Sequence, residues 1–190
     1  MKKALLALFA ASAFTMSAFA AEDTYSVDPH HTWPYFEVTH LGYSTQHGRF
    51  AKTSGTVKLD MAAKKGSVDL NIDATSLDMG FPLWNEHLSA EGFFDLAKYK
   101  SITFKSDKLI FSGDKVVAAE GEFTLLGVTK PLKIEVHNFK CGEHPMMKGK
   151  QMCGANITGV VKRSEFGMTK YLPAIGDDVR IEVPIEVIKN

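Results

Sequence analysis

Apolar and polar residues alternate along much of the chain, which is the spacing of β-strands that bury one face and expose the other. In the clearest segment the apolar residues are Val179, Ile181, Val183, Ile185 and Val187. The residues between them are Arg180, Glu182, Pro184 and Glu186. Similar patterns predict about eight strands, roughly at residues 32–41, 47–60, 67–77, 101–112, 114–126, 131–141, 153–165 and 178–189.

Short turns separate these segments. Sequences such as Ala63-Lys64-Lys65-Gly66 and Ser112-Gly113-Asp114-Lys115 are too short for a crossover connection, so the strands they join are antiparallel neighbours. About eight such strands predict an all-β, up-and-down barrel. Residues 81–100 break the alternation, and we expect one or two short helices there that cap the barrel.

Two prolines fall in the interior of predicted strands. Proline has no N–H to donate to a neighbouring strand, so it is confined to edges and bulges of a sheet. Pro34 and Pro184 therefore each predict an edge or a bulge.

The first residues have the features of a secretory signal peptide. Lys2 and Lys3 precede a short apolar run, and small residues follow in an Ala-x-Ala pattern that ends at Ala20. We expect residues 1–20 to be removed on export and residues 21–190 to form one barrel domain. Removal takes away two of the 22 basic residues and none of the 22 acidic ones, so the net charge becomes −2 and nothing attracts nucleic acid.

The chain has two cysteines, Cys141 and Cys153. Because export places them in an oxidising compartment, we predict a disulfide, which contributes about 3 kcal/mol on the chain-entropy model. The segment between them contains His144, Met146 and Met147. Thiolates, thioethers and imidazole suit Cu(I), so copper handling by this hairpin is an alternative to a stapled loop.

A closed barrel of eight strands either fills its interior with side chains or holds one small ligand. Composition does not separate the two, because aromatic residues suit a packed core as well as a cavity wall. An apolar cavity would favour an apolar guest, since each buried methylene contributes about 0.8 kcal/mol.

Several blocks of sequence resemble the YceI-like family of periplasmic, lipocalin-like, polyisoprenoid-binding proteins, and they cover nearly all of residues 21–190. The blocks are Tyr25-Ser-Val-Asp28 with His31, Phe36-Glu-Val-Thr-His40-Leu-Gly42, Glu86-His87-Leu88-Ser89, Gly121-Glu-Phe123-Thr124-Leu-Leu-Gly127-Val-Thr129-Lys130-Pro131 and Arg163-Ser-Glu-Phe166-Gly167-Met168. Their order and spacing carry the resemblance more than any single block.

The resemblance implies an eight-stranded antiparallel, lipocalin-like barrel in the periplasm, with a long apolar tunnel for an isoprenoid lipid that can carry a quinone-like head. It implies binding or carriage without catalysis. Implied partners are the lipid and an inner-membrane donor or acceptor protein, and exposed barrel edges also admit a homodimer. An Arg-Asp pair frequent in the family is replaced here by Trp84 and Asn85, and the segment from Cys141 to Cys153 is an insert.

We expect the tunnel lining and its lid to come from apolar residues on inward strand faces and on the irregular segment. These residues are Phe36, Val38, His40, Phe50, Phe81, Trp84, Leu88, Phe94, Phe104, Phe123 and Phe166. For each apolar residue, plain packing in the core or on the barrel rim is the alternative. The ring of His40 either donates a hydrogen bond to an oxygen-bearing head group or is satisfied by a neighbouring protein group.

The sequence contains no nucleophile elbow, zinc-protease helix, phosphate loop or dinucleotide turn. We therefore expect no enzyme and no cofactor apart from the bound lipid. We also expect no metal site, since adjacent His30 and His31 would point to opposite faces of a strand. The competing function is a structural or interaction module whose barrel is packed solid.

Overall fold

A computed structural model describes residues 22–190, so the predicted signal peptide at residues 1–20 lies outside the described residues. The strands are β1 (Asp23–Val27), β2 (Tyr35–His40), β3 (Ser44–Phe50), β4 (Thr53–Asp60), β5 (Lys65–Asp73), β6 (Leu77–Asp78), β7 (Ser101–Ser112), β8 (Lys115–Leu125), β9 (Val128–Glu143), β10 (Gln151–Lys162) and β11 (Asp178–Lys189). The helices are α1 (Pro82–Ser89) and the 3₁₀ turns η1 (Ala74–Ser76) and η2 (Arg163–Phe166).

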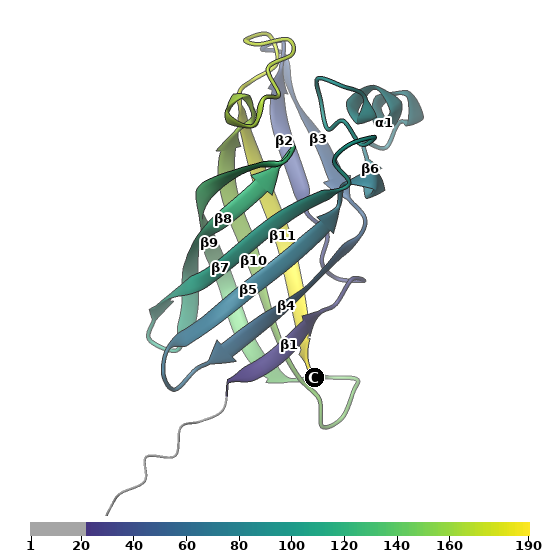
Figure 1. Cartoon of the computed structure of the whole chain (residues 1–190). Coiled ribbons are helices and arrows are strands. Elements are labelled where there is room, and N and C mark those ends of the chain that lie inside the picture. Colours follow the sequence, from purple (N-terminus) through teal and green to yellow (C-terminus); the bar gives the residue numbers. More distant parts are fainter. Residues whose placement is uncertain (1–21) are drawn as a thin grey trace, which may run out of the picture.

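The strands form one antiparallel sheet that closes into a barrel (Figure 1). Neighbours run in the order β1, β4, β5, β7, β8, β9, β10 and β11, and β11 pairs again with β1. Toward the end that carries α1, β2, β3 and β6 continue the paths of β1, β4 and β5. The eight-stranded antiparallel barrel predicted from the alternation is therefore confirmed.

Alternate residues of each strand fill the barrel interior. Along β11, Val183, Ile185 and Val187 are buried, while Pro184 and Glu186 lie between them on the outer face. On neighbouring strands Phe104 of β7 and Phe123 of β8 are directly paired. Burial of such side chains is the main favourable contribution to folding, at roughly 1.5–3 kcal/mol each.

The N-terminal part of the barrel differs most from the predicted strands. Of the strand expected at residues 32–41, only the later part forms, as β2. A strand that was not expected, β1, precedes it, and Tyr25 and Val27 of β1 are buried. Two alternating apolar residues are too few to stand out in the sequence.

The expected strand at residues 47–60 is in fact two strands, the end of β3 and all of β4, which a bend after Phe50 separates. The expected strand at residues 67–77 ends at Asp73, and its last residues form η1 and the start of β6. The other strands match more closely, and β7 and β11 have the predicted boundaries.

Residues 28–34 interrupt the barrel between β1 and β2, and both prolines border this interruption. Pro34 immediately precedes β2, while Pro184 lies opposite the gap, because β1 pairs with β11 only from Val187 onward and β2 only as far as Glu182. Backbone groups two residues apart on a strand point to the same side. The side of Pro184 that lacks an N–H therefore faces the gap. Within the gap β11 has no strand partner on this side, so the gap is a local edge in the middle of β11.

The hydroxyl of Thr32 replaces the missing strand partner in this gap. Thr32 is fully buried, and its Oγ1 accepts a hydrogen bond from the Glu186 N–H at 3.1 Å and donates to the Glu186 carbonyl at 3.3 Å. The Asp28 N–H also donates to this carbonyl, at 2.9 Å. Backbone polar groups are thus satisfied where strand pairing stops.

Helix α1 is held by its flanking residues. Pro82 occupies the first turn, where a missing N–H costs nothing, and Asn85 Oδ1 accepts a hydrogen bond from the Met79 N–H at 2.7 Å. Among residues 22–190, no helix is long and apolar enough to cross a membrane.

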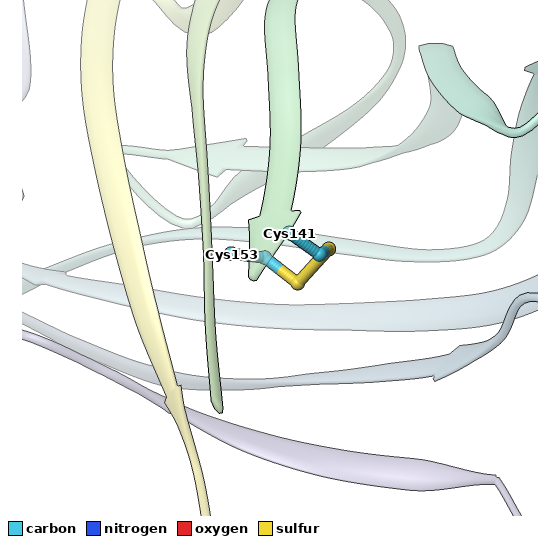
Figure 2. The surroundings of a disulfide bond; sticks show 2 residues. All are labelled: Cys141 and Cys153. Atoms are coloured by element: carbon cyan, nitrogen blue, oxygen red, sulfur yellow. A yellow bond between two sulfur atoms is a disulfide. The ribbon is translucent and has the colours of Figure 1, made fainter. Parts of the chain in front are cut away.

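The predicted disulfide is confirmed. Cys141 of β9 and Cys153 of β10 lie directly opposite each other in the sheet, and a bond joins their sulfur atoms (Figure 2). Cys153 is buried beneath the strands. In this oxidised state neither cysteine offers a thiolate to a metal ion.

We predict that Thr32→Val destabilises the barrel by about 1–3 kcal/mol, because the backbone N–H of Glu186 loses its acceptor while the side-chain volume is kept. Urea unfolding measures the change. Thr45→Val, an exposed position in β3, is the matched control and should stay within about 0.5 kcal/mol of the parent. Equal losses in the two variants would contradict the role of Thr32.

Candidate functional site

A cavity of about 270 Å³ lies inside the barrel at the end that carries α1; we call it the upper cavity. Its apolar lining consists of Phe36, Val38, Met79, Trp84, Leu88, Phe93, Phe94, Leu125, Val161, Met168, Ile175 and Val179. Its polar lining residues are His40, Gln46, His87, Arg163 and Tyr171. The site is therefore an apolar chamber with a few polar groups.

One wall of the upper cavity follows from strand alternation. Phe36, Val38 and His40 of β2 all line it. Gly48 of β3 is paired with Phe36, and a Cβ atom at Gly48 would overlap the Phe36 ring. The absence of a side chain at Gly48 thus gives the Phe36 ring its place in the wall.

A second wall comes from α1 and the segment that follows it. The ring centroids of His87 and Phe93 are 4.7 Å apart, and those of Phe93 and Tyr171 are 6.0 Å apart. Lys170 Nζ lies 5.1 Å from the Phe93 ring centroid and 5.3 Å from that of Tyr171, within the range of cation–π attraction. These contacts join α1 to the loop between η2 and β11.

Arg163 fixes that loop from inside. Its guanidinium is buried and donates four hydrogen bonds of 2.8–3.0 Å to the carbonyl oxygens of Gly176, Met168, Lys170 and Ile175. Burial lowers the pKa of Arg163, and the charge of Asp177 opposes this shift. A buried cation is costly unless it is hydrogen-bonded, so the four carbonyls account for the presence of Arg163 in the cavity lining.

The mouth of the upper cavity, where the lining residues Trp84 and His87 are exposed, carries hydrogen-bonding groups that other protein groups leave free. Within residues 22–190, no side-chain hydrogen bond engages the imidazole of His40 or that of His87. The centroid of the His40 ring lies 6.3 Å from that of Trp84, which is 36% exposed. These rings can hydrogen-bond a polar group at the opening while the apolar walls contact a hydrocarbon chain.

Six of the predicted lining residues do line the upper cavity: Phe36, Val38, His40, Trp84, Leu88 and Phe94. Phe50 lies outside the lining, in ring contact with Phe36 and Phe94 at centroid distances of 5.6 and 5.4 Å. Phe81 precedes α1 and is 51% exposed. Which of these residues contact a ligand stays a prediction.

Phe104, Phe123 and Phe166 are buried core residues deeper in the barrel; we call them the aromatic partition. The rings of Phe123 and Phe166 meet edge to face at a centroid distance of 5.6 Å. Below them is a lower cavity of about 70 Å³ lined by residues such as Ala119 and Val187. Along β8, Phe123 falls between Ala119 and Leu125, which line the lower and upper cavities.

Sequence reasoning missed the contribution of the loop between η2 and β11. Met168, Tyr171 and Ile175 line the cavity from this loop, and Arg163 lines it from η2. The loop has no periodicity. The available signals were the block Arg163-Ser-Glu-Phe166-Gly167-Met168 and the block Ile175-Gly176-Asp177-Asp178-Val179 that follows it, and the resemblance gave neither of them a role in the cavity.

A closed antiparallel barrel with an apolar internal cavity places the chain among lipocalin-like barrel proteins. A family model described as the YceI-like domain matches residues 25–187. A UPF0312 protein of Vibrio parahaemolyticus is 34% identical over 196 residues that span 100% of both chains. The chain therefore belongs to the YceI-like family.

Solved structures share the fold. A YceI protein of Campylobacter jejuni matches with a TM-score of 0.66 and 26% identity, covering 80% of this chain and 90% of that one. A polyisoprenoid-binding domain of Saccharophagus degradans matches with a TM-score of 0.62 and 16% identity, covering 87% and 98%. At the latter identity the likeness concerns the fold alone.

Asp177 makes the cavity loop sensitive to acid. Its carboxylate accepts hydrogen bonds from the Ser164 N–H at 2.9 Å and the Ser164 hydroxyl at 2.8 Å. The backbone bond from Ser164 is the main cause that holds the pKa of Asp177 below its usual value. The resulting stabilisation is complete above the unfolded-state pKa of about 3.9 and is lost as pH falls through the lower folded-state pKa.

We predict that Asp177→Asn removes part of the stability loss between about pH 5 and pH 2, because amide Oδ1 still accepts a hydrogen bond but does not titrate. Urea unfolding measured across this range tests it. Asp107→Asn, an exposed position in β7, is the control and should keep the parent pH profile. An unchanged profile in Asp177→Asn would contradict the coupling.

Proposed function

We propose that this protein is a non-catalytic periplasmic binding protein that carries an apolar lipid of the isoprenoid type in the upper cavity. The observation that carries the proposal is the chamber of about 270 Å³, whose lining is mostly apolar and includes a few hydrogen-bonding groups. Family membership and the name of the Saccharophagus degradans neighbour, a polyisoprenoid-binding domain, support the same ligand class.

The balance of groups around the cavity favours a chain over a polar metabolite. Each methylene transferred from water to the apolar wall contributes about 0.8 kcal/mol to binding. Among the lining residues that the structure describes, Arg163 is the one permanently charged side chain, so the chamber has no array of charges that would bind a charged ligand. The imidazoles of His40 and His87 near the mouth suit one oxygen-bearing head group, such as a quinone or a phenol.

The volume limits how much of the lipid is enclosed. Binding pockets for drug-sized ligands run from about 300 to 1,000 Å³, and the upper cavity alone is smaller at about 270 Å³. A long isoprenoid therefore places one segment in the upper cavity. The rest leaves through the mouth or enters the lower cavity after the aromatic partition moves aside, so the long tunnel expected from the resemblance requires a rearrangement.

The two competing functions have less support. A solidly packed barrel is at odds with an apolar chamber of about 270 Å³ next to α1. Copper handling by the hairpin loses two ligands to the disulfide, and His144 Nδ1 is occupied by the N–H groups of Met146 and Met147 at 3.1 and 3.0 Å. The metal ligands that remain in the hairpin are the thioethers of Met146 and Met147 and His144 Nε2.

We predict that protein purified from the periplasm without detergent contains an apolar lipid in stoichiometric amount. Extraction with organic solvent followed by mass spectrometry identifies it. Absence of any stoichiometric lipid after growth under several conditions would favour the packed-barrel interaction module instead.

A matched pair of substitutions ties the lipid to the upper cavity. Val38→Trp fills the chamber from β2, whereas Val117→Trp places the same side chain on the exposed face of β8. We expect Val38→Trp to lose most of the co-purified lipid and Val117→Trp to retain it. Equal lipid content in two folded variants would place the ligand elsewhere.

A further inference from the structure

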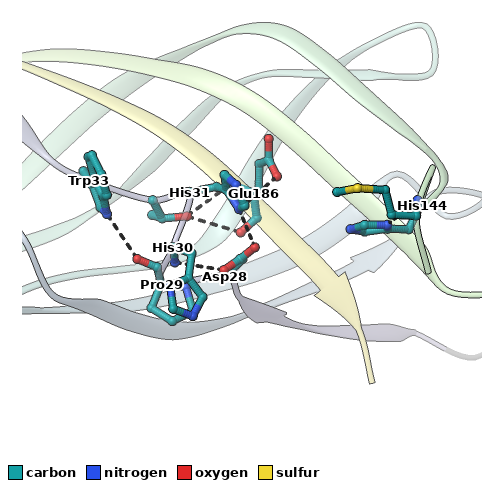
Figure 3. Close-up of polar contacts among 9 residues, drawn as sticks. Asp28, Pro29, His30, His31, Trp33, His144 and Glu186 are labelled. Carbon is teal, nitrogen blue, oxygen red and sulfur yellow. Dashed lines mark hydrogen bonds and ion pairs between the residues drawn. The ribbon is translucent and has the colours of Figure 1, made fainter.

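Three ligand-type side chains converge on the outer face of the barrel at the interruption between β1 and β2. Asp28 and His31 come from the connecting segment, and Glu186 comes from β11 (Figure 3). His31 Nδ1 lies 2.7 Å from Asp28 Oδ2 and 3.8 Å from Glu186 Oε2. All three ligand atoms lie within 4.8 Å of one another.

The backbone around these side chains is fixed independently of them. The Asp28 N–H donates a hydrogen bond to the Glu186 carbonyl at 2.9 Å, and the buried Thr32 hydroxyl accepts one from the Glu186 N–H. Asp28 Oδ1 accepts the His30 N–H at 2.9 Å, which leaves Oδ2 directed at His31. Such supporting bonds hold metal ligands in position in proteins.

The cluster is also open on one side. The side chain of Asp28 is only 13% exposed, whereas those of His31 and Glu186 are 61% and 41% exposed. His31 and Glu186 line a surface hollow of about 340 Å³ that also borders Glu143. An ion bound by the three side chains would thus be reached from solvent and would keep water in its remaining coordination positions.

We propose that Asp28, His31 and Glu186 form a binding site for a divalent metal ion of the zinc type. The ion takes the place of the proton that lies between His31 Nδ1 and Asp28 Oδ2. An imidazolium releases that proton to solvent and keeps the one on Nε2, whereas a neutral Nδ1–H ring gives up this proton and takes one from solvent on Nε2. One imidazole nitrogen and two carboxylate oxygens suit Zn²⁺, whereas Ca²⁺ and Mg²⁺ prefer oxygen ligands throughout. This assignment departs from the metal-free expectation drawn from the sequence.

The required movements are small. Tetrahedral Zn²⁺ with bonds of about 2.0–2.2 Å separates its ligand atoms by about 3.4 Å. The His31–Asp28 distance of 2.7 Å must widen and the His31–Glu186 distance of 3.8 Å must shorten, each by less than about 1 Å. Rotation of exposed side chains provides this without moving the strands.

Isothermal titration of the untagged, chelator-treated protein with ZnCl₂ tests the site. We expect saturable 1:1 binding that weakens at least about tenfold in His31→Ala and, separately, in Glu186→Gln. Co²⁺ used as a spectroscopic probe should give visible absorption bands in the parent that disappear in His31→Ala. Because both substituted side chains are partly exposed, circular dichroism should show a folded barrel in each variant.

Two control variants decide which residues hold the ion. His30 is the exposed neighbour outside the cluster, and His144 belongs to the separate Cys141–Cys153 hairpin (Figure 3). His30→Ala and His144→Ala should leave the Zn²⁺ affinity unchanged. No saturable Zn²⁺ binding, equal affinity in His31→Ala, or a loss confined to His144→Ala would overturn the proposal, while the lipid content of the upper cavity is a separate result.

Discussion

Pairing of β1 with β11 closes the sheet, and the other features of the molecule depend on this closure. A closed sheet has a definite inside, so strand alternation directs apolar residues to one interior. Closure is incomplete at residues 28–34, where the Thr32 hydroxyl rather than a strand bonds Glu186. The same interruption accommodates Pro184 and brings Asp28 and His31 next to Glu186.

Large aromatic side chains then determine how the interior is used. Along β8, the buried Phe123 lies between Leu125, which lines an upper cavity of about 270 Å³, and Ala119, which lines a lower one of about 70 Å³. The upper cavity exists because α1 and the loop held by Arg163 extend the barrel beyond the aromatic partition. The interior of this barrel is thus filled by side chains in one part and hollow in another.

Most of the barrel was predictable from periodicity, because a strand with one buried and one exposed face has alternating apolar and polar residues in its sequence. Periodicity located β7 and β11 to the residue and missed β1, which is too short to show a period. Alternation on β2 indicated the residues that line the cavity wall, although their contact with a ligand stays a prediction, whereas the contribution of Tyr171 was missed because its loop has no repeat. The proximity of Asp28 to Glu186 depends on barrel closure, which no local pattern encodes.

Methyl NMR of the protein titrated with a short isoprenoid alcohol tests the central claim most directly. Val38 and Val179 line the upper cavity, whereas Val57 and Val187 line the lower one. We predict saturable chemical-shift changes at Val38 and Val179 that exceed those at Val57 and Val187. Absence of saturable changes, or changes centred on the lower cavity or the outer surface, would contradict the account.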